Sequence, residues 1–308
     1  MIAILGSGGS VANGLVQLLS RDNHAFRLVS RSGRTQPGAT ETVRADLSDR
    51  DQAIQAVAGC DAAYLVAGLK YDHKVWAEVW PRIMANTIEA CKRAGTRLIF
   101  LDNVYMYGRV NGVMTEETPF NPASRKGEIR ARIANALMRE WQSGGLTAMI
   151  ARAADFYGPE TPSGIPNAMV FTPLSLGKKA SWLVNDAVPH SFTFTPDIAQ
   201  ALLKLAATES AWNQTWHLPT SPKPPTGREF IAMAAETLGI APRYRVLSKP
   251  MVRIFGWFQP VVGEVHEMLY QNDSPYLFDS SKYAAAMGFS GTAYDEGIRI
   301  TAESFRRI

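Results

Sequence analysis

The sequence is poor in cysteine and histidine, and neither residue type gathers anywhere along it. Its 308 residues include two cysteines, Cys60 and Cys91, which stand in apolar stretches, and five scattered histidines. Structural zinc sites need cysteines and histidines at short spacings, and disulfide frameworks need several cysteine pairs. We therefore expect no metal centre and no disulfide framework.

Long apolar runs and long runs of one charge are also missing. No segment approaches the ~20 consecutive apolar residues that cross a bilayer. The first residues, MIAILGSGG, have no basic stretch and reach glycine too early for a signal peptide. The net charge of +4 is mild and is not concentrated in a lysine and arginine cluster, so nucleic acid is not an expected partner. The sequence predicts a cytoplasmic protein with no membrane partner.

The first 150 residues show a regular alternation of short apolar runs and amphipathic stretches. This alternation is typical of a parallel sheet whose strands are connected by helices. Pro81 lies inside the third helical pattern, so it should kink that helix or mark its first turn. We expect strands over 1–5, 25–31, 41–47, 61–68, 97–103 and 146–158, and helices over 11–20, 51–59, 76–94 and 127–142.

Beyond Pro159 this alternation stops. Residues 159–190 are rich in proline, glycine and serine, which indicates an irregular lobe. Two helices should follow, over 195–207 and 226–239, because threonine stands at the N-cap of each.

A glycine-rich turn joins the first expected strand to the first expected helix. In AILGSGGSVANGLV, Gly6, Gly9 and Ala12 form the pattern G-x-x-G-x-x-A. The first glycine permits a tight turn, the second lets the backbone approach a pyrophosphate, and the alanine lets the helix pack close to the sheet. The turn predicts a dinucleotide site at the helix N-terminus; the alternative is a tight turn that binds no ligand. The predicted contacts on this turn are Gly6, Ser7, Gly9, Ser10 and Val11.

The end of the second expected strand indicates which dinucleotide binds. A carboxylate at this point would bind the ribose hydroxyls of NAD, but the chain reads VSRSGR, with Arg31 and Arg34 and no acid. A guanidinium can pair with a 2′-phosphate through two hydrogen bonds. We therefore expect NADP as the cofactor, contacted by Arg31, with NAD the lesser candidate. The alternative is that Arg31 is a solvated strand end.

Several segments, in order, resemble motifs of the extended short-chain dehydrogenase/reductase family, also called the NAD-dependent epimerase/dehydratase family. The likeness covers nearly the whole chain. Besides the glycine turn, the segments are ADL (45–47), CDAAYLVAG (60–68), DNVYMYG (102–108), RAADFYGP (152–159), TFTPDIAQAL (193–202) and DSSKYAAAMGFSGTAYDEGIRITAESF (279–305).

The resemblance implies an α/β fold, a Rossmann-type doubly wound parallel sheet with a smaller C-terminal substrate lobe and the active site between them. Residues 1–158, completed by about 190–220, would form the NADP-binding domain, and 159–189 with 221–308 the substrate-binding lobe. It also implies cofactor contacts near the ends of later strands, although Asp46 can instead be an ordinary polar residue at a strand end. These implied contacts are Asp46, Leu47, Val66, Ala67, Gly68 and Ala153.

The residues that usually catalyse the reactions of this family are replaced by others in this sequence. The resemblance places Lys126 at the position of the proton-transferring tyrosine, Arg130 at that of the ribose-binding lysine, and Asn103 at that of the serine or threonine. Arg130 can still hydrogen-bond ribose hydroxyls, and Asn103 can donate to a carbonyl oxygen. Lys126 could act as an acid if burial and the charge of Arg130 favoured loss of its proton. Cations at this helix start oppose the helix dipole, which fits a site that faces cofactor phosphates.

Five further residues are candidates for contact with a substrate: Tyr71, Asp102, Tyr105, Tyr157 and Trp182. Tyr71 follows the fourth expected strand, where substrate loops form in the family. Tyr105 could point into the cleft or pack, and Asp102 could act as a general base or pair with the neighbouring cations. Trp182 could shape a substrate pocket or belong to the core of the lobe.

The sequence thus predicts an NADP(H)-dependent oxidoreductase or epimerase-type enzyme that acts on a small carbonyl, hydroxyl or sugar-like substrate. Lys126 would be the proton donor, Asn103 the carbonyl ligand and Arg130 the ribose anchor. Two alternatives stay open: a redox-inactive NADP-binding regulator, and a lyase or isomerase that uses the cofactor structurally. The resemblance also implies a homodimer that packs through the helices over 76–94 and 127–142.

Overall fold

The computed structural model describes residues 1–162 and 164–306, and the chain divides into two compact units. The first unit comprises Met1–Met106, Arg125–Arg152 and Ile198–Trp216. The second comprises Tyr107–Ser124, Ala153–Asp197 and the chain from His217 onward. None of the helices within the described residues is both long and apolar enough to cross a bilayer.

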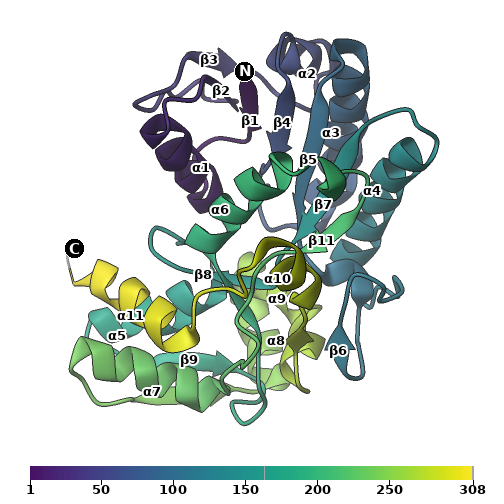
Figure 1. Ribbon diagram of the computed structural model, residues 1–308. Coiled ribbons are helices and arrows are strands. Elements are labelled where there is room, and N and C mark those ends of the chain that lie inside the picture. The colour runs from purple at the N-terminus through teal and green to yellow at the C-terminus, as the bar shows by residue number, and fades with distance from the viewer. Residues whose placement is uncertain (163, 307–308) are drawn as a thin grey trace. The chain divides into compact units, whose positions relative to one another are not determined.

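The first unit is built on a seven-stranded sheet (Figure 1) with the order β11-β7-β5-β4-β1-β2-β3. The registers of β1 with β2 and β4, of β2 with β3, and of β5 with β4 and β7 are all parallel. The carboxyl ends of β1, β4 and β5 therefore meet along one edge of the sheet. The strands are β1 (Ile2–Leu5), β2 (Phe26–Ser30), β3 (Glu41–Arg44), β4 (Ala62–Leu65), β5 (Arg97–Asp102), β7 (Ala148–Arg152) and β11 (Thr215–His217).

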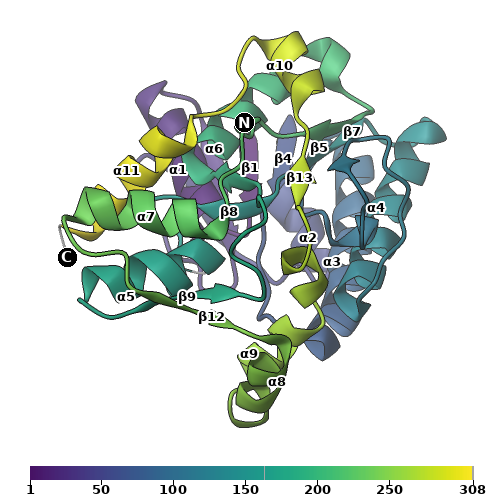
Figure 2. The ribbon, with the colours of Figure 1, turned by 90° about the horizontal axis from the view of Figure 1, so that it is seen from below.

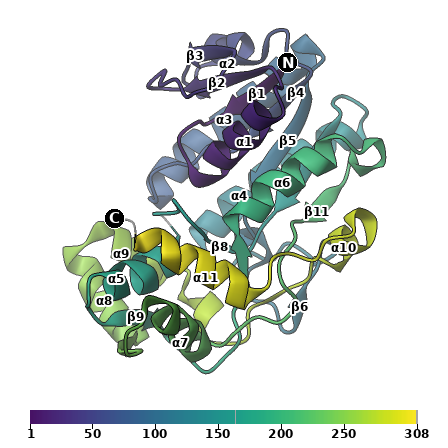
Figure 3. The same ribbon diagram turned by 60° about the vertical axis from the view of Figure 1, so that its left-hand side comes forward.

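Helices cover both faces of this sheet. Figures 1 and 3 show α1 and α6 on one face and α2, α3 and α4 on the other. A Cβ at Gly14 of α1 would lie 2.9 Å from the Cβ of Ala199 in α6, so glycine lets these two helices approach closely. The α/β, doubly wound Rossmann-type fold expected from the sequence is confirmed. The helices are α1 (Ser10–Arg21), α2 (Arg50–Val57), α3 (His73–Ala94), α4 (Arg125–Gln142) and α6 (Thr195–Ala206).

Helix α3 starts earlier than the sequence indicated. Its N-cap is Asp72, whose carboxylate accepts hydrogen bonds from the backbone N–H groups of Lys74 and Val75, and this cap fixes the start at His73. Pro81 therefore lies well inside the helix and does not mark its first turn. The helix ends at Ala94, and its C-cap Gly95 has the left-handed conformation that favours glycine (φ +66°).

The expected strand over 146–158 is two strands, which is a correction to the sequence-based expectation. Strand β7 ends at Arg152, and β8 (Asp155–Tyr157) pairs with β10 (Phe192–Phe194) in the second unit. The backbone N–H of Ala154 donates to the Thr193 hydroxyl at 3.0 Å, so the chain has already left the large sheet there. Arg152 and Asp155, on either side of this change of sheet, interrupt the apolar run.

The second unit holds short strands in three parallel pairs, β10 with β8, β12 with β9, and β13 with β6. Figure 2 shows α5, α7 and α11 side by side. The buried core of this unit is rich in aromatic residues. The predicted capping box at the start of α7 is confirmed. The remaining elements are β6 (Val113–Met114), β9 (Ala180–Leu183), β12 (Tyr244–Leu247), β13 (Leu277–Phe278), α5 (Thr172–Ser175), α7 (Gly227–Leu238), α8 (Lys249–Phe258), α9 (Pro260–His266), α10 (Ser281–Met287) and α11 (Tyr294–Phe305).

Candidate active site and cofactor cradle

The glycine turn after β1 passes against the segment that follows β4. Gly6 has φ +103°, and a Cβ placed on it would lie 2.3 Å from the Cα of Ala67, so no larger residue fits. Gly8 also has a positive φ, +105°, and needs glycine for the same backbone reason. The sequence argument had passed over Gly8, although the run of glycines contained the signal.

The space above this turn suits a pyrophosphate. Gly9 is the N-cap of α1, and within the described residues no atom beyond the adjacent residues of the chain lies within 4 Å of a Cβ built on Gly8 or Gly9. The N–H groups of Gly6 and Ser7 donate to the carbonyl of Val29 at 3.0 Å. The donors that remain for an anion are therefore those at the start of α1, where Ser10 and the buried Val11 follow Gly9.

Three arginines gather beyond the end of β2. Arg31 is exposed, and its carbonyl accepts a hydrogen bond from Nε of Arg44 at 3.1 Å. Arg34 follows within the same turn, in which Gly33 packs on the side chain of Arg44. The sequence argument missed Arg44, because β3 brings it to this place through strand pairing rather than through proximity in sequence.

Asp46 and Leu47, which the family resemblance places near the adenine of the cofactor, differ in their surroundings. Asp46 accepts hydrogen bonds at Oδ1 from the backbone N–H and the hydroxyl of Ser48, at 2.9 and 2.8 Å. These bonds, with a smaller contribution from the charge of Arg31, hold the pKa of Asp46 below its ordinary value. Leu47 is buried. Asp46 therefore has a structural role whether or not adenine also contacts it.

Val66, Ala67 and Gly68 continue the chain from β4 at the same edge of the sheet. The N–H of Val66 donates to the carbonyl of Leu5 at 3.0 Å. This bond holds the segment beside the glycine turn. Val66 and Ala67 are half-buried, and Gly68 is exposed.

Beyond β4 and β5, the structure brings several of the predicted catalytic and substrate residues together. Lys126, at the start of α4, is 0% exposed, and its Nζ lies 4.6 Å from the centre of the Tyr71 ring. The hydroxyls of Tyr71 and Tyr105 are 3.4 Å apart. Asn103 accepts a hydrogen bond at Oδ1 from the N–H of Tyr105 at 3.1 Å, which orients its amide. We call Lys126, Tyr71, Tyr105 and Asn103 the lysine–tyrosine cluster.

Arg130, one turn further along α4, is held inside the first unit. Its Nε and Nη2 lie 2.7 and 2.5 Å from Oδ1 of Asp102. The guanidinium carbon lies 4.6 Å from the ring centre of Trp80 and 5.0 Å from that of Phe100. Of the two roles weighed for Asp102, the structure shows the pairing role.

Arg152 completes this buried charge group. Its Nε lies 3.6 Å from Oδ2 of Asp102, and the three side chains are at most 5% exposed. One carboxylate therefore stands between two guanidiniums. The sequence argument did not find Arg152, which reaches Asp102 because β5 and β7 pair with these two residues in register.

Three predicted residues lie in the second unit. Tyr157 is 1% exposed and packs in the core of that unit against Phe194, Phe230 and Tyr294, and burial raises its pKa well above the ordinary value. This placement does not support the predicted contact of Tyr157 with a substrate. Ala153 is buried directly after β7. Trp182 lines an apolar cavity, and its Nε1 donates to the carbonyl of Asn185 at 3.1 Å.

Sequence comparison identifies relatives for most of the chain. The profile of the NAD dependent epimerase/dehydratase family matches residues 2–216. A 3beta-hydroxysteroid-dehydrogenase/decarboxylase isoform 2 of Arabidopsis thaliana is 22% identical over 316 residues, which cover 90% of this chain and 53% of the relative, so the chain spans about half of that protein. A 3-diazoavenalumate denitrifying reductase of a Streptomyces species is 24% identical over 272 residues, covering 83% of this chain and 88% of the relative.

Solved structures confirm the fold over almost the entire length. MoeE5 in complex with UDP-glucose and NAD superposes with a TM-score of 0.79 at 20% identity, covering 99% of this chain and 98% of that one. The UDP-glucose 4-epimerase of Thermus thermophilus in complex with NAD gives 0.79 at 19% identity, with the same coverage. The match of the family profile to more than half of the residues decides the assignment: this chain belongs to the NAD-dependent epimerase/dehydratase family.

Proposed function

We propose that this enzyme is an NADP(H)-dependent oxidoreductase or epimerase-type enzyme that acts on a small carbonyl, hydroxyl or sugar-like compound. The observation that carries the proposal is the lysine–tyrosine cluster, in which a buried ammonium faces a tyrosine ring beside a pair of hydroxyls. The cluster follows the carboxyl ends of β4 and β5, the edge at which open α/β sheets bind their ligands.

Each side chain of the cluster has a role in this proposal. When bound, the dinucleotide supplies or accepts a hydride. Lys126 donates a proton to the carbonyl oxygen of the substrate during reduction and takes it back during oxidation. Asn103 donates a hydrogen bond from its amide nitrogen to the same oxygen, because its Oδ1 is already bound by the Tyr105 N–H.

The pairing of Arg130 with Asp102 restricts its expected role as ribose anchor. Two of its three guanidinium nitrogens lie on Asp102, and its side chain is 5% exposed. A ribose hydroxyl would therefore have to reach Nη1. This same observation favours the second candidate function, a redox-inactive NADP-binding regulator, in which Arg130 is purely structural. A lyase or isomerase that uses its cofactor structurally is the third candidate.

The names of the relatives agree with redox chemistry on a small molecule. One curated relative is named as a dehydrogenase/decarboxylase and the other as a reductase, and solved neighbours contain NAD. We propose NADP for this chain because arginines rather than an acid follow β2. We also propose a homodimer that packs through α3 and α4, which lie against each other.

Oxidation of NADPH by the purified protein distinguishes the candidate functions. Purified enzyme is mixed with NADPH and a panel of aldehydes, ketones and keto-sugars, and the nicotinamide absorbance is followed. Loss of absorbance with at least one carbonyl supports the oxidoreductase. Uptake of NADPH by calorimetry without any turnover or epimerisation would favour the regulator, and no uptake of either dinucleotide would overturn the proposal.

The Arg31→Asp variant tests the choice of cofactor. Charge-assisted hydrogen bonds contribute ~1.5–3 kcal/mol each, so the preference for NADPH over NADH should fall by about 10- to 100-fold. The measurement is the ratio of the two dissociation constants by calorimetry. Arg132→Asp, at an exposed position of α4, is the matched control and should leave the ratio unchanged. An unchanged ratio in Arg31→Asp would remove Arg31 from the phosphate site.

A further inference from the structure

The helical pair α8 and α9 of the second unit leaves an apolar stripe in solvent. Four large apolar residues recur along α8 at the i, i+3, i+4, i+7 spacing that normally faces a protein core: Met251, Ile254, Phe255 and Phe258. All four are exposed, whereas Val252 of the same helix is buried. Within the described residues, six of the eleven exposed large apolar residues lie on this pair. We call these six the α8–α9 patch: Met251, Ile254, Phe255, Trp257, Phe258 and Val261.

The opposite side of α8 is anchored in the second unit. Val252, 1% exposed, packs with Leu183 and Leu269 in a small apolar cluster. Helices α8 and α9 lie against each other (Figure 2), and a Cβ on Gly256 would lie 2.7 Å from the Cα of Gly263. Since Val252 and Gly256 are four residues apart, they share one side of α8. The apolar stripe therefore lies on the other side, away from both contacts.

Two aromatic residues at the end of α8 are the most exposed members of the patch. Trp257 and Phe258 are 74% and 79% exposed, so each leaves on the order of 150 Å² of mainly apolar surface in water. Single apolar residues scattered over a surface are ordinary, but a contiguous group of them marks a contact with a protein or a membrane. This concentration indicates that the patch has a partner.

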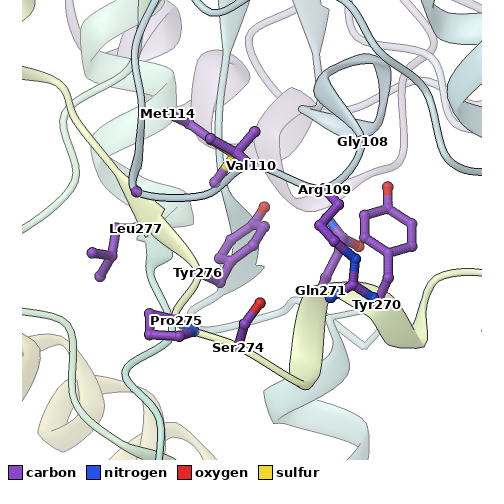
Figure 4. Close-up of a pocket in the computed structure, with 11 residues that line it drawn as sticks. Gly108, Arg109, Val110, Met114, Tyr270, Gln271, Ser274, Pro275, Tyr276 and Leu277 are labelled. Atoms are coloured by element: carbon purple, nitrogen blue, oxygen red, sulfur yellow. The ribbon is translucent and has the colours of Figure 1, made fainter.

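The charge around the patch has one sign. Residues 237–263 contain no acidic residue and four exposed cations: Arg243, Arg245, Lys249 and Arg253. Nζ of Lys249 lies 2.6 Å from Asp273, which also accepts hydrogen bonds from Arg109, labelled in Figure 4, at 2.8 and 2.9 Å. This one carboxylate stands between two cations, so a net positive charge remains. A positive surface beside exposed aromatic side chains complements anionic lipid headgroups.

A bilayer surface fits the patch better than a second protein does. A stable protein interface buries about 800 Å² on each partner over roughly 20–30 residues, and the patch offers six side chains of one helical pair. At a bilayer, a few aromatic and aliphatic side chains with basic residues beside them are enough. Arg253 lies one turn before Trp257, so its guanidinium can reach lipid phosphates while its stem lies along apolar surface.

We infer that the α8–α9 patch docks this protein on an anionic bilayer surface, with Trp257 and Phe258 among the lipid headgroups. The sequence-based expectation of no membrane partner came from the lack of a spanning segment. A helix that lies in the interface needs no such segment. The docking does not depend on the proposed function.

Co-sedimentation of the intact protein with vesicles tests this docking. Vesicles of phosphatidylcholine alone are compared with vesicles in which about one third of the lipid is phosphatidylserine. We expect the partition coefficient to be at least about tenfold higher for the anionic vesicles, because each basic residue near the surface adds to the attraction. It should fall as added salt screens the charges. No sedimentation with the anionic vesicles, or equal partition into both kinds, would overturn the inference.

Variants connect the binding to the patch. Trp257→Ser and Phe258→Ser, combined in one protein, remove the inserted rings and should lower the partition coefficient at least about tenfold. Arg253→Glu should lower it about tenfold. The controls Leu176→Ser and Lys223→Glu change an exposed apolar residue and an exposed cation elsewhere in the second unit, and they should bind like the wild type. Unchanged partition in the variants of the patch would overturn the inference.

Light scattering without lipid tests the competing occupant, a second copy of this chain. If a dimer of the wild type became a monomer in the combined Trp257→Ser and Phe258→Ser variant, the patch would be a self-association surface and the inference would be overturned. Equal masses for the wild type and the variant support the membrane assignment, since a dimer through α3 and α4 would persist in both. Because both side chains are largely in solvent, the variant should keep the unfolding temperature of the wild type.

Discussion

Replacing Asp102 with asparagine should lower the free energy of unfolding of the first unit by about 3–5 kcal/mol, the usual cost of removing one partner from a buried ion pair. The carboxylate lies between the guanidiniums of Arg130 and Arg152, and all three side chains are nearly inaccessible. Asparagine keeps the shape and removes the charge, so two buried cations would face each other across a neutral amide. The repulsion between the two cations and the loss of their pairing with Asp102 both destabilise the folded state.

The measurement for Asp102→Asn is chemical denaturation followed by tryptophan fluorescence, since Trp76 and Trp80 lie beside Arg130. Asp51→Asn is the matched control: Asp51 is exposed in the first turn of α2 and should contribute less than ~1 kcal/mol. A loss below ~1 kcal/mol in Asp102→Asn would mean that water or a rearranged side chain compensates the guanidiniums. The charge group would then not hold β5, β7 and α4 together.

The parts of the fold that the sequence predicted are those with local signals. The glycine turn could be located because Gly6, Gly9 and Ala12, which permit the tight turn and the close helix, all lie in one short segment. Its contact with Ala67, which is distant in sequence, was found only in the structure. The parallel sheet could be predicted because strands such as β1 and β4 are continuous apolar runs. The three-residue strand β11 was missed, because so short a segment shows no periodicity.

The candidate site was predicted only where residues lie near one another in sequence or where the family resemblance aligned them. Asn103 and Lys126 were placed by alignment, and the structure brings Asn103 and Lys126 into one cluster with Tyr71. Arg44 and Arg152 were missed because strand register, not sequence distance, carries them to their partners. Such pairings depend on which strands become neighbours in the sheet. The sequence of a single strand does not indicate its neighbours.

The largest effect on activity is expected from Lys126→Met. A positioned proton donor contributes about 10²- to 10⁴-fold to a rate, so the turnover number should fall by at least about 100-fold. The affinity for NADPH should change by less than about threefold, because the predicted phosphate contacts lie on the glycine turn and on Arg31. Turnover is followed by nicotinamide absorbance and affinity by calorimetry. Lys74→Met, which removes an exposed lysine of α3, is the control and should keep full turnover.

Two further substitutions distinguish proton donation by Lys126 from the electrostatic effect of its positive charge. Lys126→Arg keeps a cation over the Tyr71 ring but cannot give up a proton near neutral pH, so it should be as inactive as Lys126→Met if the proton matters. Tyr71→Phe keeps the ring and removes the hydroxyl 3.4 Å from that of Tyr105, and it should keep most of the turnover. If instead Lys126→Arg is active and Tyr71→Phe is not, the tyrosine hydroxyl is the proton donor. Lys126 would then only stabilise negative charge beside it.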